Sequence, residues 1–325
     1  LAESALLAGL PQAPSLYDPL LYPEAALERQ AVVVELMVKQ GYITEEAARL
    51  ARAETLQWSA AAFPIEAPHF VFYVWNLLER RYGPEALYSG LTVWTTLDLD
   101  LTRAAQAIAQ RRLAELAGEA GGLPHNASNA ALVALDPRTG QILAMLGSPD
   151  YFDAAISGAV NLALAPRQPG SAIKPVLVAA ALEDNIVSPA SVIWDIPVTY
   201  TVGLPASLGG AVSNRDDLLY RPRNYDERFH GPVTVRSALA NSYNIPMVKL
   251  LDQLGVPRML EVARALGIRS LAQDDDWYGL SLTLGGGEVT LLDLTTAYHT
   301  IANSGVYRTP QLVREVRDSK GEVIP

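Results

Sequence analysis

Cysteine is absent from this chain of 325 residues. Its absence excludes a thiol nucleophile, a disulfide framework and a thiolate-bound metal. Histidine is scarce, and the four that occur lie far apart, without the close spacing typical of metal ligands: His69, His125, His230 and His299. We therefore expect neither a metal nor any other cofactor.

Positive charge is also in short supply. The chain has 25 lysines and arginines against 35 aspartates and glutamates, which gives a net charge of −10. An acidic chain without a basic stripe lacks the electrostatic surface that binds nucleic acid, so we exclude that class of partner. Because 50% of the residues are hydrophobic, the chain can bury a sizeable core, and its composition argues against intrinsic disorder.

Long apolar runs are missing as well. No segment approaches the ~20 consecutive apolar residues that a membrane-spanning helix needs, and no signal peptide is visible. The chain begins at Leu1 within a helical pattern, without a capping residue or an initiator methionine. These features predict a fragment of a longer protein, whose membrane anchor would lie in a missing N-terminal part.

Residues 1–60 predict a helical region. Apolar residues recur at helical spacing in three segments, 2–10, 24–39 and 44–56. Proline-rich sequence separates the first two segments. Thr44 is placed to cap the third, which carries two glutamates in its first turn, where they favour the helix dipole.

Residues 61–127 predict a connector with its own structure. Helical patterns cover 68–82 and 99–116. Between them, the segment 91–96 is rich in β-branched and aromatic residues and predicts a β-strand. The glycine-rich sequence that follows the second helix marks a plausible domain boundary.

Residues 128–325 predict an α+β domain. Two apolar segments, 131–135 and 141–146, flank an Asp-Pro-Arg-Thr-Gly turn and predict an antiparallel hairpin. Helical patterns follow at 172–182 and across 233–266. The change from helices to a mixture of hairpins and helices separates this region from the N-terminal helical region.

Ser171 and Lys174 form the only Ser-x-x-Lys in the chain. Pro169 and Gly170 break the chain before a predicted helix, so Ser171 and Lys174 fall on one face of its first turn. A serine hydroxyl is a weak nucleophile until a base takes its proton, and a neutral Lys174 could be that base if its pKa fell well below ~10.4. The N–H groups of the helix N-terminus could stabilise an oxyanion. Such spacing also arises by chance, and the lysine is then usually a solvated surface charge.

Ser242 and Asn244 form the only Ser-x-Asn in the chain. In a short loop, alternate residues can point the same way, so both side chains could face a substrate. The hydroxyl could relay a proton between Lys174 and a leaving amine, and the carboxamide could hold a peptide group. Alternatively, both side chains only satisfy backbone groups between two helices.

Together and in this order, the two motifs resemble the pattern of penicillin-binding proteins and class A β-lactamases. The sequence around them resembles class A penicillin-binding proteins in particular, over segments 95–98, 131–147, 224–226, 230–234, 284–290, 297–298 and 302–305. Residues 3–15 and 41–44 resemble the C-terminal end of the glycosyltransferase domain of that family. The similarity spans nearly the whole chain.

This resemblance implies a fold and an activity. The fold would be a β-lactamase/transpeptidase-like domain, an antiparallel sheet with helices, preceded by helices from the tail of a glycosyltransferase domain. The activity would be that of a peptidoglycan D,D-transpeptidase, with Ser171 as nucleophile, Lys174 as its proton acceptor, Ser242 as proton relay and Asn244 binding the peptide. The expected partners are peptidoglycan stem peptides, β-lactams and other cell-wall synthesis proteins, at the extracytoplasmic face of a bacterial cell membrane.

One family motif is missing. No Lys-[Ser/Thr]-Gly occurs in the chain, although in the family that motif follows later in the sequence and binds the substrate carboxylate. Either the chain is truncated or a separate chain supplies the rest of the domain. Truncation is the simpler explanation, and it would leave an unpaired sheet edge. The acidic catalytic residues of the family's glycosyltransferase domain also lie upstream of this sequence, so we expect no glycan polymerisation.

Two alternatives stay open. A D,D-carboxypeptidase or β-lactamase would form the same acyl-enzyme at Ser171 but use water as the acceptor. An inactive fragment with a structural or interaction role would agree with the missing Lys-[Ser/Thr]-Gly. The glycosyltransferase-like tail favours the transpeptidase, because it couples the domain to strand synthesis.

Overall fold

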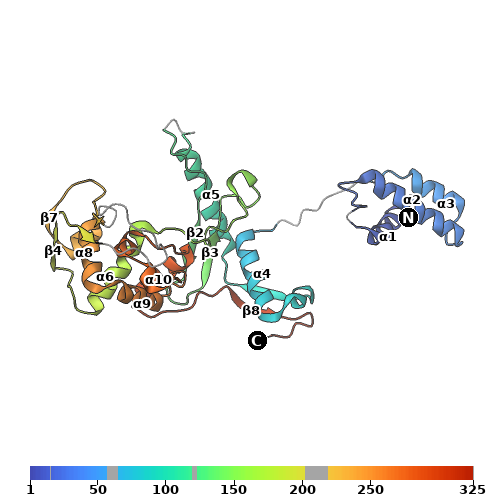
Figure 1. The fold of residues 1–325 in the computed structure, drawn as a ribbon. Helices are drawn as coiled ribbons and strands as arrows, with labels where there is room; N and C mark the ends of the chain where they lie inside the picture. The colour runs from blue at the N-terminus through green and yellow to red at the C-terminus, as the bar shows by residue number, and fades with distance from the viewer. Residues whose placement is uncertain (15, 57–64, 119–122, 202–218, 325) are drawn as a thin grey trace, which may run out of the picture. The chain divides into compact units, whose positions relative to one another are not determined.

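A computed structural model describes residues 1–14, 16–56, 65–118, 123–201 and 219–324 (Figure 1). Contacts divide the chain into two compact units, Leu1–Pro64 and Ile65–Pro325. The helices are α1 (Ala2–Gly9), α2 (Pro23–Lys39), α3 (Glu45–Ala53), α4 (Pro68–Tyr82), α5 (Leu99–Leu116), α6 (Lys174–Glu183), α7 (Val235–Ala240), α8 (Asn244–Leu254), α9 (Val256–Leu266) and α10 (Leu291–Ala302). The strands are β1 (Thr92–Thr95), β2 (Leu132–Leu135), β3 (Ile142–Leu146), β4 (Val192–Asp195), β5 (Tyr200–Thr201), β6 (Leu219–Tyr220), β7 (Gly231–Thr234) and β8 (Val313–Arg317).

The first unit is helical, as its apolar spacing predicts. Helices α1, α2 and α3 bury a small core of alanines and valine: Ala2, Ala5, Val34, Ala48 and Ala51. The predicted cap is present, because the Thr44 side chain accepts a hydrogen bond from the Ala47 amide at 3.2 Å. The boundary predicted at residue 60 lies outside the described residues.

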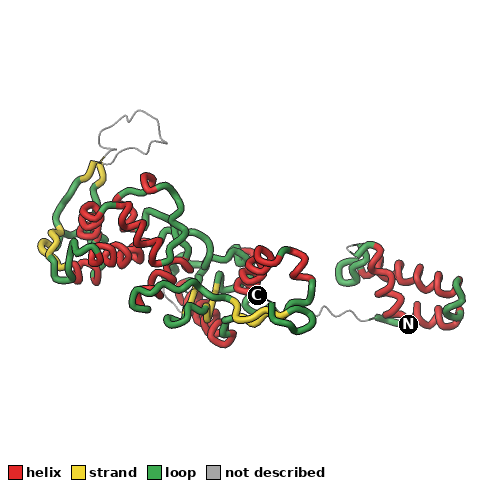
Figure 2. The backbone as a smooth tube through the Cα atoms, turned by 90° about the horizontal axis from the view of Figure 1, so that it is seen from below, coloured by secondary structure: helices red, strands yellow, loops and turns green. Residues whose placement is uncertain are grey.

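The second unit mixes helices with antiparallel strand pairs, which confirms the predicted α+β class (Figure 2). Within the described ranges the strands form four two-stranded sheets, β1–β8, β2–β3, β4–β7 and β5–β6. The β2–β3 pair is the predicted hairpin, with Leu132 opposite Leu146. The β1–β8 pair joins the first and last strands of the chain's described part, with Thr92 opposite Arg317.

A buried cluster unites the connector with the hairpin. Helix α4 contributes Phe70 and Val74, and β3 contributes Ile142 and Met145. At the end of β1, the buried Thr96 hydroxyl lies 2.8 Å from the Ile142 carbonyl and 2.9 Å from the Gln311 carbonyl. These contacts tie the connector to the domain that it precedes.

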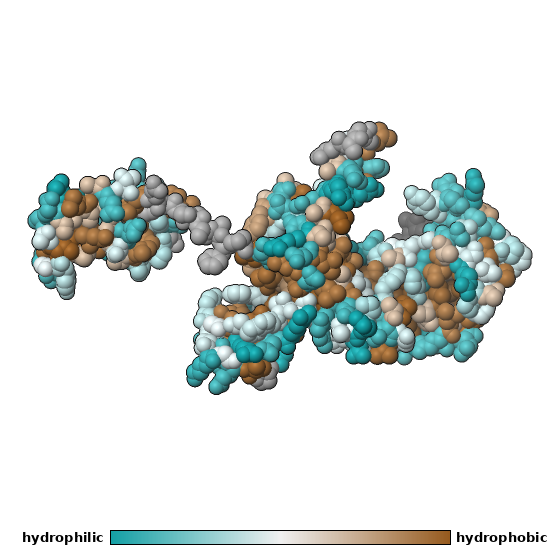
Figure 3. Space-filling model, turned by 180° about the vertical axis from the view of Figure 1, so that it is seen from behind, coloured by the Kyte–Doolittle hydropathy of each residue, from teal (hydrophilic) through white to brown (hydrophobic). Residues whose placement is uncertain are grey.

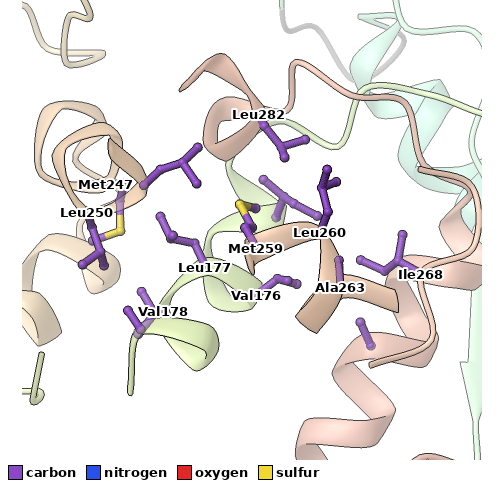
Figure 4. Packing of buried hydrophobic residues seen from close by; sticks show 14 of the residues in the cluster. Val176, Leu177, Val178, Met247, Leu250, Met259, Leu260, Ala263, Ile268 and Leu282 are labelled. Carbon is purple, nitrogen blue, oxygen red and sulfur yellow. The ribbon is translucent and has the colours of Figure 1, made fainter. Parts of the chain in front are cut away.

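The largest core surrounds α6. Val176 and Leu177 of α6 pack with Met247 and Leu250 of α8, and residues of α9 belong to the same cluster (Figure 4). Burial on several sides explains why the α6 sequence is almost continuously apolar rather than amphipathic. The core fixes α6, and therefore Lys174 at its first residue, against α8.

Hydrophobic patches also occur at the surface (Figure 3). The exposed side chains of Val71 and Trp75 on α4 line a cavity of about 370 Å³ together with Val93 and Leu97. Among the described helices, none is long and apolar enough to cross a membrane.

Candidate active site

Ser171 lies in a tight turn rather than in the first turn of an α-helix. The segment Gly170–Ile173 forms a 3₁₀ turn, and α6 begins only at Lys174. Because Pro175 has no N–H, it cannot bond the Ser171 carbonyl as an α-helix requires, and the Lys174 amide bonds it instead. Side chains three apart eclipse in such a turn, so Ser171 and Lys174 still share a face. The predicted helix start is thus wrong by two residues.

Lys174 is buried, although Ser171 is exposed. The Lys174 side chain is only 1% exposed, and its Nζ lies within hydrogen-bond distance of four oxygens. These are the Ser242 carbonyl at 2.7 Å, the Ser242 hydroxyl at 3.1 Å, the Tyr243 carbonyl at 3.3 Å and Asn244 Oδ1 at 2.7 Å. The fold therefore brings Lys174 of the first motif to both predicted residues of the second motif, and none of these four bonds involves Ser171.

Burial changes the acidity of Lys174. Removal from water disfavours the ammonium and lowers the pKa of Lys174 from 10.5 to about 8. The four neighbouring oxygens act in the opposite direction, because they accept hydrogen bonds from the charged form. A lysine in this state can exchange a proton near neutral pH.

The loop between α7 and α8 presents the second motif. Ser242 has a φ of +58°, a left-handed conformation that is uncommon for a residue with a side chain. The turn is closed by the Ser242 amide on the Leu239 carbonyl and by the Tyr243 amide on the Ala238 carbonyl. This geometry directs both the hydroxyl and the carbonyl of Ser242 to Lys174. Strained residues of this kind often lie at functional sites.

Asn224 fixes the start of α8. Its Oδ1 accepts from the Asn244 amide at 2.8 Å and from the Ile245 amide at 3.3 Å. The Asn244 side chain donates to the Arg223 carbonyl at 2.7 Å, so the same segment orients it from the other end. The sequence placed Asn224 in a family-like segment without assigning it a role, because its partner lies 20 residues away.

The glycine-rich segment 285–287 packs against the turn that carries Ser171. Gly285, with a φ of +90°, follows the 3₁₀ turn Leu280–Leu284 and abuts Gly170 so closely that an added Cβ would lie 2.3 Å from the Gly170 amide nitrogen. From α10, the Tyr298 hydroxyl donates to the Ala172 carbonyl at 2.9 Å. Ser171 is thus held by contacts on both sides.

Over the described ranges, no three histidines, cysteines, aspartates or glutamates are grouped so that they could hold a metal ion. The site consists of hydroxyl, amine and carboxamide groups around one buried lysine.

Comparison with known proteins identifies the family. The model of the penicillin-binding protein transpeptidase domain matches residues 130–324. The chain belongs to the penicillin-binding protein transpeptidase family. It is 30% identical to penicillin-binding protein 1A of Aquifex aeolicus over 399 residues, which cover 100% of this chain and 52% of that protein. The predicted family is confirmed.

Solved structures agree with this family. Penicillin-binding protein 1A from Haemophilus influenzae superposes with a TM-score of 0.76 at 24% identity, covering 99% of this chain and 59% of the other. Penicillin-binding protein 3 from Mycobacterium tuberculosis, complexed with ampicillin, gives a TM-score of 0.55 at 25% identity, covering 72% of this chain and 52% of the other. The likeness confirms the transpeptidase fold. The chain spans about half the length of the curated relatives that it matches.

Proposed function

We propose that this transpeptidase domain is a peptidoglycan D,D-transpeptidase and that Ser171 is its nucleophile. The observation that carries the proposal is the buried Lys174, which joins the Ser171 turn to Ser242 and Asn244. An exposed hydroxyl on the same face as an amine of lowered pKa can be activated for attack on a carbonyl. The ampicillin complex of the Mycobacterium relative supports a β-lactam as a substitute substrate.

The reaction divides into two steps. Neutral Lys174 takes the Ser171 proton while Oγ forms a bond to the D-Ala-D-Ala carbonyl carbon. The C–N bond to the terminal D-alanine breaks, and its nitrogen receives a proton through the Ser242 hydroxyl, 3.1 Å from Lys174. An amine of a neighbouring stem peptide then forms a bond to the acyl carbon, the C–O bond to Ser171 breaks, and the proton that the amine loses passes through Lys174 to Oγ. Asn244 would hold the stem peptide through its carboxamide.

Labelling with a fluorescent penicillin tests this assignment. The β-lactam ring opens on Ser171, so the unaltered chain should carry a covalent adduct on the tryptic peptide that contains this serine. We expect Ser171→Ala to abolish labelling and Ser319→Ala, which alters another exposed serine, to leave it unchanged. Labelling that persists in Ser171→Ala, or its absence from the unaltered chain, would contradict the proposal.

The acceptor distinguishes transpeptidation from hydrolysis. With a stem peptide ending in D-Ala-D-Ala, a transpeptidase should form a cross-linked product when an acceptor amine is added. A D,D-carboxypeptidase or β-lactamase would release the free acid whether or not the amine is present. Product analysis by mass spectrometry, with and without the amine, separates these outcomes.

The cellular role, the location, the partners and the domain assignment are also proposals. The relatives that are called penicillin-binding protein 1A support a role in cell-wall synthesis at the outer face of a bacterial membrane, with other synthesis proteins as partners. We assign residues 1–60 to the tail of a glycosyltransferase domain, 61–127 to a connector and 128–325 to the transpeptidase domain. Glu3, which belongs to the glycosyltransferase-like tail, would have a structural role.

A further inference from the structure

The loop that holds Lys174 rests on a second layer of polar contacts. Asn224, which is buried, accepts from the first two amides of α8. Its side-chain nitrogen donates to the Arg228 carbonyl at 2.8 Å and to Asp195 Oδ2 at 2.8 Å. All polar atoms of the Asn224 side chain are therefore engaged, and Asp195 determines which way the carboxamide faces.

Asp195 is a fully buried carboxylate at the end of β4, with a relative exposure of 0%. Its Oδ2 accepts three hydrogen bonds: from Asn224, from the His230 amide at 3.0 Å and from His230 Nδ1 at 2.6 Å. The pairing of β4 with β7, in which Asp195 is opposite Gly231, brings these groups together. A buried charge is costly unless it is paired and hydrogen-bonded, so this arrangement depends on all its donors.

His230 is the side chain whose ring faces Asp195. Its Nε2 lies 3.0 Å from Asp226 Oδ2, so each ring nitrogen faces a carboxylate that can only accept. The hydrogen bond to Asp195 is the largest influence that raises the pKa of His230, and Asp226 adds to it. Asp195 also acts on Lys249 of α8. The pKa of Lys249 is lowered by burial, and the charge of Asp195 raises it by less.

His230 also contacts the loop directly. Its ring stacks on Tyr243, with ring centroids 3.9 Å apart and planes inclined by 18°. Tyr243 is the residue between Ser242 and Asn244, and its carbonyl lies 3.3 Å from Lys174 Nζ. The loop that contains Ser242 and Tyr243 is therefore held by two contacts: Asn224 bonds the start of α8, and His230 stacks on the Tyr243 ring.

We propose that Asp195 and His230 are positioning residues, which hold the Ser242–Asn244 loop in the register that Lys174 needs for reaction at Ser171. The inference rests on the proposed acylation of Ser171. Neither residue touches the reacting atoms. Asp195 acts through Asn224 on the backbone of Asn244, and His230 acts through Tyr243.

Asp195→Asn tests the proposal because it keeps the shape and one acceptor oxygen but removes the charge. Asp293→Asn is a matched control, since Asp293 Oδ2 also accepts three hydrogen bonds, from the Arg269 amide and from the amide and hydroxyl of Ser270. Both carboxylates organise a loop, but only Asp195 connects to Asn224. Two measurements follow for each variant of the full chain: hydrogen exchange at the Asn244 and Ile245 amides, and the rate of fluorescent-penicillin acylation from pH 5 to pH 10.

For Asp195→Asn we expect exchange at both amides to accelerate at least tenfold. Acylation at saturating penicillin should slow at least tenfold, and the midpoint of its pH profile should move, because the oxygens around Lys174 shift. Asp293→Asn should leave the two amides and the pH midpoint unchanged. A merely structural role for Asp195 would lower the reactive fraction equally at every pH without moving the midpoint, and that result would overturn the inference.

The two proposals fail separately. If the unaltered chain does not acylate, the proposed function fails, and exchange at the two amides still reports whether Asp195 holds the loop. If the chain acylates but exchange and the pH midpoint in Asp195→Asn match those of the unaltered chain, the positioning role fails alone. Asp195→Glu, which restores the charge on a longer side chain, should recover part of the amide protection if the charge is what matters.

Discussion

Lys174, the first residue of α6, is only 1% exposed, and such burial is unusual for a lysine. Lys174 tolerates burial because its nitrogen meets four oxygens, three of them on Ser242 and Asn244. The same oxygens would lose their donor if the amine were removed. Burial and hydrogen bonding therefore act against each other, and their balance determines how readily Lys174 gives up its proton.

The pH dependence of acylation should report this balance. Burial lowers the pKa of Lys174 to about 8, so the neutral amine, which is the proton acceptor in the proposed mechanism, becomes more abundant as pH rises through that value. We expect the rate of penicillin acylation to increase from pH 6 and to level off above about pH 8 to 9. The acylation rate can be measured at a series of pH values by stopping the labelling reaction after different times. A rate that falls over this range would show that the ammonium, and not the amine, is the reactive form.

The same shift affects stability. The pKa of Lys174 is lower in the folded state than in the unfolded chain, so between pH 8 and 10.5 the unfolded state binds more protons. The contribution of this residue to the free energy of unfolding therefore increases as pH rises through that range. Below pH 8 both states are protonated and the contribution is at its least favourable.

Lys174→Met should separate chemistry from packing. Methionine fills a similar volume but cannot take a proton, and we expect acylation to slow by about 10²–10⁴-fold. The Ser242 carbonyl and Asn244 Oδ1 would also lose their donor, at a cost of roughly 1–3 kcal/mol in the free energy of unfolding. Urea unfolding and labelling rates measure the two effects. Lys39→Met, on the exposed end of α2, should change neither, and an active Lys174→Met would remove this residue from the mechanism.

At the scale of elements, the Ser171 turn depends on the close approach of Gly285 to Gly170. In Gly285→Ala the new Cβ would lie 2.3 Å from the Gly170 amide nitrogen, so the turn that carries Ser171 must shift. Gly305→Ala is a matched control, because Gly305 has a similar φ of +81° but nothing within 4 Å of an added Cβ. Both variants carry backbone strain.

We expect Gly285→Ala to lose about 1–3 kcal/mol more in the free energy of unfolding than Gly305→Ala, as overpacking does elsewhere. Acylation should slow in Gly285→Ala alone. Urea denaturation and penicillin labelling provide the two readouts. Equal losses in the two variants would mean that the contact with Gly170 does not position Ser171.

Local sequence predicted the elements well where local interactions decide them. The cap at Thr44, the hairpin β2–β3 and the helix α5, which Asp98 caps at the Leu101 amide, all follow from nearby residues. The start of α6 was misplaced by two residues because Pro175 lacks the N–H that would bond the Ser171 carbonyl in an α-helix. The pairing of β1 with β8 depends on chain closure across the whole domain, for which no local pattern exists.

The site residues also fall into those that the sequence predicted and those that depend on contacts between distant segments. Ser171, Lys174, Ser242 and Asn244 were predicted from their spacing, and their roles remain proposals. Asp195 and Asn224 were not predicted as members of the site, because each meets its partner only after β4 pairs with β7. A buried carboxylate has no signature in a sequence that contains 35 acidic residues.

At the scale of the whole molecule, the two motifs lie about 70 residues apart in sequence and meet through one core. Leu177 of α6 and Leu251 of α8 are both fully buried in that core. The side chains that bond Lys174 therefore depend on packing that none of them makes. We therefore expect that a substitution in this core can alter the site without touching a polar group.

Because the chain divides into two compact units, we expect a core substitution in one unit to leave the other unit unaffected. The first unit has its own core, in which Val34 is 0% exposed, and Leu177 is 0% exposed in the core around α6. Val34→Ala should lower the stability of the first unit by roughly 1–3 kcal/mol, through lost apolar burial and a small cavity, and leave penicillin acylation unchanged. Leu177→Ala should cost roughly 2–5 kcal/mol in the second unit and slow acylation, because α6 carries Lys174. Urea unfolding followed by hydrogen exchange resolves the two units, and a Val34→Ala variant that destabilises α6 equally would show that they unfold together.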